Sequence, residues 1–565
     1  MLETHDPPPL PAVVEQWKEA GSALANSFSN YLDLCLSFSQ LSEVGADKND
    51  LVSHFDSALQ PGALLTVLSD QLAKSRVVLA KGRNRLATQI YTFPTEILSR
   101  IFLYFVEDDS DCPTYVEFTI RTYYHRLHTL LGVSSVWRKV GISMPILWNL
   151  VPVIRDVRFT LSPLGISLSL RRSKTLPLDL AVLIPQIVPH GLATKLAKHA
   201  SRFRTINILS EQPHTIREIM SALMERHVCD SLTELSLCVS DLEHIDRLGN
   251  NPYYMFPPQS PAHPLFIQLL QSITQLRLLG ATLDWSQITF SARMVEIRIR
   301  SVIIGSDSVL HEFLQALATA PQLEKLELAT ITSFPEPNLG NPPLVILPKL
   351  QSLILSHLYF NTLSVILCSI TPFSHRLSLN LNDSALERVF SARDPELERE
   401  YVGIFELTDL LRDVHIDTLL IEGQEERFSL STLSLLFKEI PTLNTLKLDG
   451  WTIDNRFCST LKWRPQRDGR RSVMPKIPNW CLTNAKVADQ KRLKELIRSH
   501  DSKEVLLGGY ISDALKGLDE TADWKLLEGK EDIVEWLAEH VPTFRLVPGD
   551  DYLPPEFLSA IWQLW

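Results

Sequence analysis

The stretch LEKLEL at residues 323–328 decides the fold, because the same spacing of aliphatic residues returns along most of the chain. Close copies are LTELSL (232–237), ITQLRL (273–278), LQSLIL (350–355) and LNTLKL (443–448), and looser copies are FRTINI (203–208), MVEIRI (294–299) and IDTLLI (416–421). Several successive copies begin 27 or 29 residues apart, with helical patterns such as SDSVLHEFLQALATAP (306–321) between them. The chain is therefore predicted to alternate a short strand with a helix at a nearly constant period.

This period and core resemble the leucine-rich repeat, in which each turn of a solenoid contributes a strand and then a helix. One turn cannot bury its apolar face alone, so the stack is stable only as an array. The repeats are imperfect. The position that often carries Asn or Cys instead holds Ser240, Ala281, Ile331, Leu358 and Trp451. Between 360 and 415 only LSLNL (377–381) indicates a strand. We expect an α/β fold with an irregular leucine-rich-repeat arc over residues 151–455.

The strands also predict a binding face, because successive side chains of a strand point to opposite sides. With the leucines in the core, the residues between them line the concave face, the usual binding surface of a solenoid. These residues are Glu234, Ser236, Gln275, Arg277, Glu296, Arg298, Lys325, Glu327, Thr445 and Lys447. They are predicted to bind a protein substrate. Alternatively, such alternating charges simply solvate the sheet.

Composition places the chain among globular proteins, with 565 residues, 45% of them hydrophobic, and a net charge of −11. The length predicts about two to four domains. The acidic balance argues against a surface made mainly for nucleic acid. No apolar run approaches the roughly eighteen residues of a membrane span, and the N-terminus has no apolar signal core. The seven cysteines are scattered without a C-x-x-C pair, which indicates reduced thiols. We expect an intracellular protein, cytoplasmic and/or nuclear, without a membrane partner.

Residues 1–90 are predicted to form a helical region. Apolar residues recur at three- and four-residue steps from Val13 to Leu41, a second helix fits Asn49 to Leu59, and Pro61 opens a third. The stripe is too irregular for a sustained coiled coil. The expected role is packing or self-association.

The segment FPTEILSRIFLYF at 93–105 predicts a helix with two apolar stripes, where a surface helix normally shows one. Ile97, Ile101 and Phe105 form the first stripe, and Leu98 and Phe102 form the second. Such a helix suits two partners, of which only one need belong to the same chain.

Further along, LLGVSSVWRKVGISMPILWNL (130–150) predicts a helical face that Gly141 ends or loosens, after an acidic loop at 107–118. This part of the chain resembles the F-box, especially the F-box-like variant common in fungal proteins. Three segments carry the resemblance: F-P-T-E-I-L-x-x-I-F, V-S-S-V-W-R-K-V and M-P-I-L-W. Phe93 stands where that family usually has Leu, and the insertion at 107–124 departs from its pattern.

The resemblance implies a three-helix unit at 91–150 whose exposed apolar surface binds a Skp-type adaptor of a cullin–RING (SCF) ubiquitin ligase. The implied adaptor-binding residues are Phe93, Pro94, Ile97, Leu98, Ile101, Phe102, Val133, Trp137 and Trp148. The alternative is that these residues only join a helical core within the chain. An arc of repeats after such a unit resembles the leucine-rich F-box proteins, which implies that the repeats collect the substrate.

The C-terminal region, 456–565, begins with a basic stretch in which Trp463 stands among arginines: Arg464, Arg467, Arg470 and Arg471. Such a stretch binds RNA, phosphate or an acidic peptide, serves as a nuclear address, or is a solvated loop. An amphipathic helix is predicted from Lys486 to His500. The acidic remainder, with its aromatic end, is expected to cap the solenoid.

No phosphate-binding, zinc-protease or nucleophile-elbow motif occurs in the sequence. His125 and His128 lack ligand partners at metal spacing and are expected to be a surface pair. We therefore expect no catalytic, metal or cofactor-binding residues. The predicted function is a substrate receptor of an SCF ligase; the alternative is a leucine-rich scaffold that holds an acidic or nucleic-acid partner.

Overall fold

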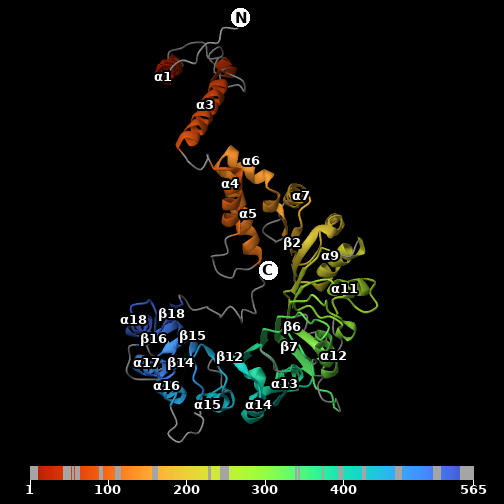
Figure 1. Cartoon of the computed structure of the whole chain (residues 1–565). Helices are drawn as coiled ribbons and strands as arrows, with labels where there is room; N and C mark the ends of the chain where they lie inside the picture. Colours follow the sequence, from red (N-terminus) through yellow and green to blue (C-terminus); the bar gives the residue numbers. More distant parts are fainter. Residues whose placement is uncertain are drawn as a thin grey trace. The chain divides into compact units, whose positions relative to one another are not determined.

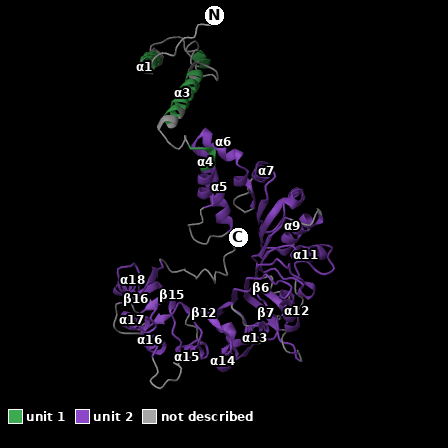
Figure 2. Cartoon of the chain, in the orientation of Figure 1, with its two compact units in different colours: residues 1–97 green, residues 98–565 purple. Residues whose placement is uncertain are grey.

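The computed structural model describes residues 10–41, 52–53, 56–57, 64–87, 93–107, 116–154, 163–226, 231–241, 254–337, 340, 344–371, 375–391, 399–422, 428–464, 474–512 and 524–547. The chain divides into two compact units, Met1–Ile97 and Leu98–Trp565 (Figure 2). The boundary falls within helix α4 (Thr95–Val106), so the first turn of this helix belongs to unit 1.

The described residues of unit 1 lie mainly in two long helices. α1 spans Leu10–Leu41, which confirms the helix expected from Val13, and α3 spans Leu64–Ala87. The second predicted helix, Asn49 to Leu59, lies largely outside the described residues. On α1 the large apolar side chains of Trp17, Leu32 and Leu34 are more than half exposed.

Unit 2 is built on one long, mainly parallel sheet whose strands follow one another in chain order (Figure 1). Its parallel ladder contains β1 (Leu150–Ile154), β2 (Leu178–Leu183), β3 (Phe203–Ser210), β4 (Glu234–Val239), β5 (Gln275–Leu279), β6 (Glu296–Ser306), β7 (Lys325–Phe334), β8 (Ser352–Ser356), β9 (Arg376–Leu381), β12 (Ile416–Glu422), β13 (Thr445–Asp449), β15 (Asn479–Val487) and β16 (Glu504–Ser512). At its end the antiparallel β17 (Trp524–Leu526) and the parallel β18 (Thr543–Leu546) join β16, and β14 (Thr452–Ile453) pairs with β15. The predicted α/β class and parallel repeat strands are confirmed.

Helices connect the strands and bury their apolar faces on one side of the sheet. The connecting helices are α7 (Pro163–Arg172), α8 (Leu192–Ala197), α9 (Pro213–Arg226), α11 (Ala262–Leu270), α12 (Asp307–Leu317), α13 (Phe360–Ser369), α14 (Ile404–Leu411), α15 (Leu430–Glu439), α16 (Asn455–Leu461), α17 (Gln490–Ser499) and α18 (Asp532–His540). Short 3-10 turns lie at η3 (Ala200–Arg202), η4 (Trp285–Gln287) and η5 (Asp383–Leu386), and β10 (Glu387–Val389) with β11 (Arg399–Tyr401) makes a separate hairpin. We call the side of the sheet opposite the connecting helices the open face.

The leucines of the motif form continuous rows across the sheet. One such row crosses five successive strands, with its residues in register and each at most 1% exposed: Leu235, Leu276, Ile297, Leu326 and Leu353. Full burial of one such side chain stabilises by about 1.5–3 kcal/mol, so the rows are the main source of stability. The repeat is thus held by its neighbours on both sides.

Of the irregular repeat positions that replace Asn or Cys, Ser240 is exposed and the other four are buried. Ala281, Ile331, Leu358 and Trp451 are all within the core. Trp451 donates its indole N–H to the backbone oxygen of Ile421 at 3.3 Å, so it ties its own coil to the preceding one. Trp451 therefore connects two successive coils by a hydrogen bond, although it is much larger than the Asn or Cys of a regular repeat.

The domain limits expected from the sequence differ from the limits of the sheet. The sheet begins at Leu150, but β1 and β2 carry no recognisable motif, and it continues beyond 455 through β15 and β16. The predicted helix from Lys486 to His500 is shorter, since Lys486 is in β15 and α17 begins at Gln490. The aromatic C-terminal end, 548–565, lies outside the described residues.

No helix in the described part of the chain combines the length and apolarity needed to cross a membrane. The described cysteines are in the reduced state: Cys35, Cys238, Cys368, Cys458 and Cys481.

Candidate interaction surfaces

The helical unit comprises the described residues of 98–148: most of α4, then α5 (Val116–Val133), α6 (Ser135–Ser143) and the 3-10 turn η2 (Pro145–Trp148). One stripe of α4 faces inward, with Leu98, Phe102 and Val106 buried. The Phe102 ring packs against Trp137 of α6, with 5.0 Å between ring centroids. The second predicted stripe therefore holds the unit together.

The sequence predicted that Gly141 would end or loosen the second helix, and this was wrong. Gly141 is buried inside α6, which continues to Ser143. A Cβ at this position would stand 2.7 Å from Cδ2 of Leu131. A larger residue at this position would require the Leu131 side chain to move. At the other end of α6, the Ser134 hydroxyl accepts a hydrogen bond from the Trp137 N–H at 3.1 Å, a normal N-cap.

Trp148 is part of the core of the unit. It is 2% exposed, and its indole N–H donates to the backbone oxygen of Gly141 at 3.0 Å. The guanidinium of Arg172 lies 4.2 Å from the centre of its ring. In this conformation Leu98, Phe102 and Trp148 offer no surface to a partner, because their side chains are enclosed by the chain itself.

The remaining residues of the implied adaptor set are more accessible. In unit 2, Val133 is exposed, and Ile101 and Trp137 are partly exposed. In unit 1, Phe93, Pro94 and Ile97 are exposed. The implied adaptor set does not include several exposed apolar residues of the helical unit, although Phe105 belongs to the predicted first stripe: Tyr104, Phe105, Phe118, Val136, Ile142 and Ile146. Their positions in the helices made them indistinguishable from core residues in the sequence.

α5 connects the helical unit to the first strands. Val116 and Ile120 pack with Leu150, Ala181 and Leu183 on the open face of β1 and β2. The hydroxyl of Tyr124 donates to the backbone oxygen of Leu150 at 2.6 Å. The open face is therefore covered at its start.

His125 and His128 also lie on α5. The structure places His128 6.5 Å from the Tyr124 ring, between centroids. In the described residues, no group of three His, Cys, Asp or Glu side chains could hold a metal ion.

The ten residues expected on the concave face all lie on strands, at open-face positions in register with one another. Glu234, Gln275, Glu296 and Lys325 form one row, and Ser236, Arg277, Arg298 and Glu327 form the next. Thr445 and Lys447 lie on β13, farther along the sheet, and Lys447 is buried. The alternation rule thus assigned each side chain to the correct face.

On β4–β7 these side chains bind mainly to one another. Glu296 accepts from Nε of Arg277 at 2.9 Å and is paired with Nε of Arg298 at 2.6 Å. Glu327, which is 3% exposed, pairs with Arg298 at 3.7 Å and with Arg300, a residue that the motif did not predict. We call Glu234, Arg277, Glu296, Arg298, Arg300 and Glu327 the ion-pair network.

Protonation in the network follows the balance between burial and pairing. Burial opposes ionisation of Glu296, but Arg277 and Arg298 outweigh it and hold the pKa of its carboxyl below the usual value. For Glu234 burial prevails over Arg277 and raises the pKa. The pKa of Lys325 is lowered by burial and then by Arg298. The network is a preorganised surface of both signs whose charges largely compensate one another.

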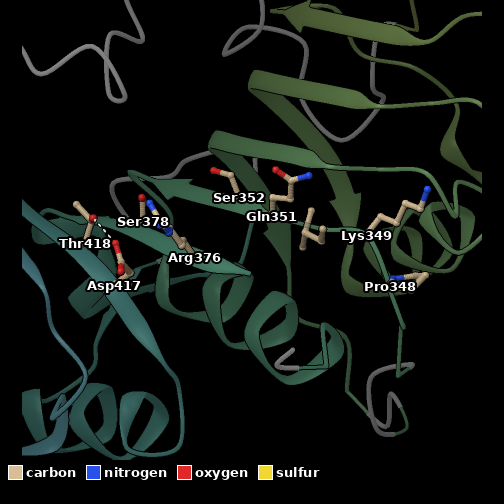
Figure 3. Close-up of a pocket in the computed structure, with 9 residues that line it drawn as sticks. Pro348, Lys349, Gln351, Ser352, Arg376, Ser378, Asp417 and Thr418 are labelled. Atoms are coloured by element: carbon tan, nitrogen blue, oxygen red, sulfur yellow. Dashed lines mark hydrogen bonds between the residues drawn. The ribbon is translucent and has the colours of Figure 1, made fainter. Parts of the chain in front are cut away.

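A cavity of about 780 Å³ lies farther along the sheet, where β8, β9 and β12 begin (Figure 3). We call it the polar pocket. Its lining residues are Pro348, Lys349, Leu350, Gln351, Ser352, Arg376, Ser378, Asp417 and Thr418. Ser352 and Arg376 are partners in register, as are Ser378 and Thr418. Asp417 is an extra residue, because the register between β9 and β12 shifts between Ile416 and Thr418.

The basic stretch of the C-terminal region contributes little to the described surfaces. Trp463 and Arg464 are described, and Lys476 lies 5.3 Å from the centre of the Trp463 ring. Arg467, Arg470 and Arg471 lie outside the described residues, so their predicted role is not tested.

No protein-family model and no curated protein matches the chain. A solved structure titled "Crystal structure of TLR13-ssRNA13 complex" matches 54% of this chain and 45% of that chain, with 13% sequence identity and a TM-score of 0.23. The chain thus matches less than half of that structure, and a likeness this weak carries no argument about fold or function.

Proposed function

We propose that the protein is a substrate receptor of a cullin–RING ubiquitin ligase. The helical unit, with the first turn of α4, binds a Skp-type adaptor, and the open face of the repeats binds a protein substrate. The receptor contributes proximity and no catalytic residue, since tethering raises the effective concentration of the substrate near the ligase.

The observation that supports this proposal best is the division of α4 into two stripes. Leu98 and Phe102 are buried, whereas Ile97 and Phe105 are each 44% exposed. A helix that served only its own chain would have no need of the outward apolar stripe. Covering one such side chain fully contributes about 1.5–3 kcal/mol, so a few of them suffice as anchors of an interface.

Charged substitutions on the outward stripe test this proposal. We expect Ile97→Asp and Phe105→Asp to abolish co-purification with a Skp-type adaptor, because a carboxylate would be desolvated in the interface. Phe405→Asp is the matched control: Phe405 is an exposed aromatic residue of α14, away from the helical unit. It should leave adaptor binding unchanged. Circular dichroism verifies that each variant is folded.

Folded wild-type protein that fails to capture the adaptor would refute the ligase role. The alternative would then be a leucine-rich interaction scaffold without a ligase, for which the ion-pair network and the polar pocket offer polar contacts. A scaffold that holds nucleic acid through the basic stretch would show strongly salt-dependent RNA binding. Neutralising Arg464, Arg467, Arg470 and Arg471 would remove that binding.

A further inference from the structure

We propose that the polar pocket binds an anionic side chain, a carboxylate or a phosphoryl group, on a segment of the protein that the open face recruits. This inference rests on the proposed role of the repeats in binding a protein substrate. It is independent of whether the helical unit binds an adaptor.

The cations of the polar pocket differ from those of the ion-pair network. Arg277, Arg298 and Arg300 are each paired with a glutamate. Arg376 is exposed and has no carboxylate partner among the described residues. The ammonium of Lys349 donates to the neutral amide oxygen of Gln322 at 2.5 Å, which leaves its charge uncompensated. On the described open face, positive charge is therefore available to an incoming anion at the pocket.

The arrangement of the polar groups suits an oxyanion. Ser352 on β8 and Arg376 on β9 are opposite each other in register, and Ser378 on β9 is opposite Thr418 on β12. Neighbouring strands are about 4.8 Å apart, so an anion between them is within reach of several donors. A guanidinium binds carboxylate and phosphate through two parallel hydrogen bonds, and hydroxyls complete the remaining acceptor sites. Figure 3 shows Arg376, Ser378 and Thr418 at one end of the cavity, with Ser352 and Gln351 beside them.

Asp417 is the one carboxylate in the lining. The strand irregularity leaves it without a partner in register on β9, and it accepts a hydrogen bond from the Thr418 hydroxyl at 3.1 Å. No ion pair joins it to Lys349 or Arg376 in the described structure. Its negative charge opposes a bound anion, so it limits affinity for small free anions. A larger ligand that also presents an N–H donor would satisfy Asp417 and bind more tightly.

The size of the pocket favours a peptide segment over a single ion. A volume of about 780 Å³ falls within the range typical of sites that enclose a ligand, about 300–1,000 Å³. An extended peptide offers backbone N–H groups for Asp417 and an acidic or phosphorylated side chain for Arg376. The arginines of the ion-pair network beside the pocket are already paired with glutamates, so the network would provide only surrounding contacts.

The experiment measures fluorescence anisotropy of three labelled peptides with the full chain. One peptide carries glutamates, one carries phosphoserine, and one carries glutamine and serine at the same positions. Inorganic phosphate is added as a competitor. We expect binding of at least one anionic peptide and none of the neutral one. A preference for the phosphoserine or the glutamate peptide identifies the source of the anion.

Three substitutions test whether the peptides bind in the polar pocket. Arg376→Gln should weaken binding about tenfold or more, the effect of losing a charge-assisted bidentate contact. Asp417→Asn should tighten binding of free inorganic phosphate several-fold, because it removes the opposing charge that a small anion cannot satisfy with an N–H donor. Lys438→Gln is the matched control, since it removes one exposed positive charge from α15, away from the pocket. It should leave the affinity unchanged.

Equal affinity of wild-type and Arg376→Gln protein for the anionic peptide would overturn the proposal. So would the absence of binding to both anionic peptides, or binding of phosphate without either peptide. Adaptor co-purification is measured on the same Arg376→Gln protein, in which it should remain intact. This measurement distinguishes loss of peptide binding at the pocket from loss of adaptor binding.

Discussion

Two glutamates of the ion-pair network should respond in opposite ways to the same substitution. Glu296 and Glu234 lie on the open face, two strands apart, and both contact Arg277. The Arg277–Glu296 distance is 2.9 Å, whereas the Arg277–Glu234 distance is 3.8 Å. We expect Glu296→Gln to destabilise the repeats and Glu234→Gln to leave their stability unchanged or slightly increased.

The magnitude follows from the contacts that each carboxylate makes. Glu296 is engaged at 2.9 and 2.6 Å by two guanidinium groups. A charged hydrogen bond contributes about 1.5–3 kcal/mol and is roughly twice as strong as a neutral one. Glutamine keeps an acceptor oxygen but loses the charge, so we expect a loss of about 2 kcal/mol. At 3.8 Å Glu234 gains too little from Arg277 to offset its burial, which is why its pKa is raised.

The two carboxyls also predict opposite pH dependence. The folded pKa of Glu296 is lowered, so its contribution is present above the unfolded pKa of about 4.3 and is lost as the pH falls through the folded value. The folded pKa of Glu234 is raised, so its contribution is present below the unfolded pKa and is lost as the pH rises through the folded value. At neutral pH only Glu296 therefore stabilises the fold as an anion.

Hydrogen exchange of the amides in β5 and β6 is the direct measurement, because it reports the local opening free energy even if the chain does not unfold in two states. Urea unfolding followed by circular dichroism gives the global comparison. Equal losses of protection in Glu234→Gln and Glu296→Gln at neutral pH would refute the reasoning. It would mean that the distance to Arg277 does not decide which carboxylate is stabilising.

Three further substitutions or conditions test other parts of the fold. Gly509→Ala should destabilise β16 by about 3 kcal/mol or more, because φ is 123° and a Cβ would lie 2.4 Å from the backbone of Ala485. An unchanged urea unfolding curve would contradict this prediction. His500, whose Nε2 lies 2.8 Å from the Leu461 oxygen, has a pKa lowered to about 4 by burial. Stability should therefore fall by about 3 kcal/mol between about pH 6.5 and 4, as seen in hydrogen exchange of β15 and α17, and a flat profile would argue against a buried neutral imidazole. Trp148→Ala should lower the stability of the helical unit by about 3–5 kcal/mol, and Trp148→Phe should lower it much less, as measured by hydrogen exchange in α6. Equal effects of the two substitutions would contradict the idea that Trp148 stabilises the unit by packing.

The repeat strands could be predicted because their signal is strictly periodic. The motif LEKLEL determines both the strand and the side on which each residue lies, so Lys325 and Glu327 were assigned to the open face from alternation alone. β1 and β2 escaped prediction because every one of their residues is buried, on one side of the sheet or the other. Such strands lack the alternation that marks a half-exposed sheet.

Pairwise contacts were harder to predict than positions. The pairing of Glu296 on β6 with Arg277 on β5 could not be predicted, since it depends on the register between two strands that are separate in the sequence. Asp417 enters the polar pocket through a shift in strand register, which depends on the neighbouring strand and not on the local pattern. Trp148 was predicted to be an interface residue, but it is buried within its own chain. The sequence does not distinguish an apolar residue that its own chain covers from one that a partner covers.

The order of the strands has a consequence for how the protein is made. From β1 to β9 each strand pairs with the strand that precedes it in the chain, and β12, β13, β15 and β16 continue the series. A chain leaving the ribosome therefore always finds the edge it must join already synthesised. Each addition closes a loop of roughly one repeat, which keeps the entropic cost of closure small. The sheet can thus grow during translation, and each new strand covers the edge left by the one before it.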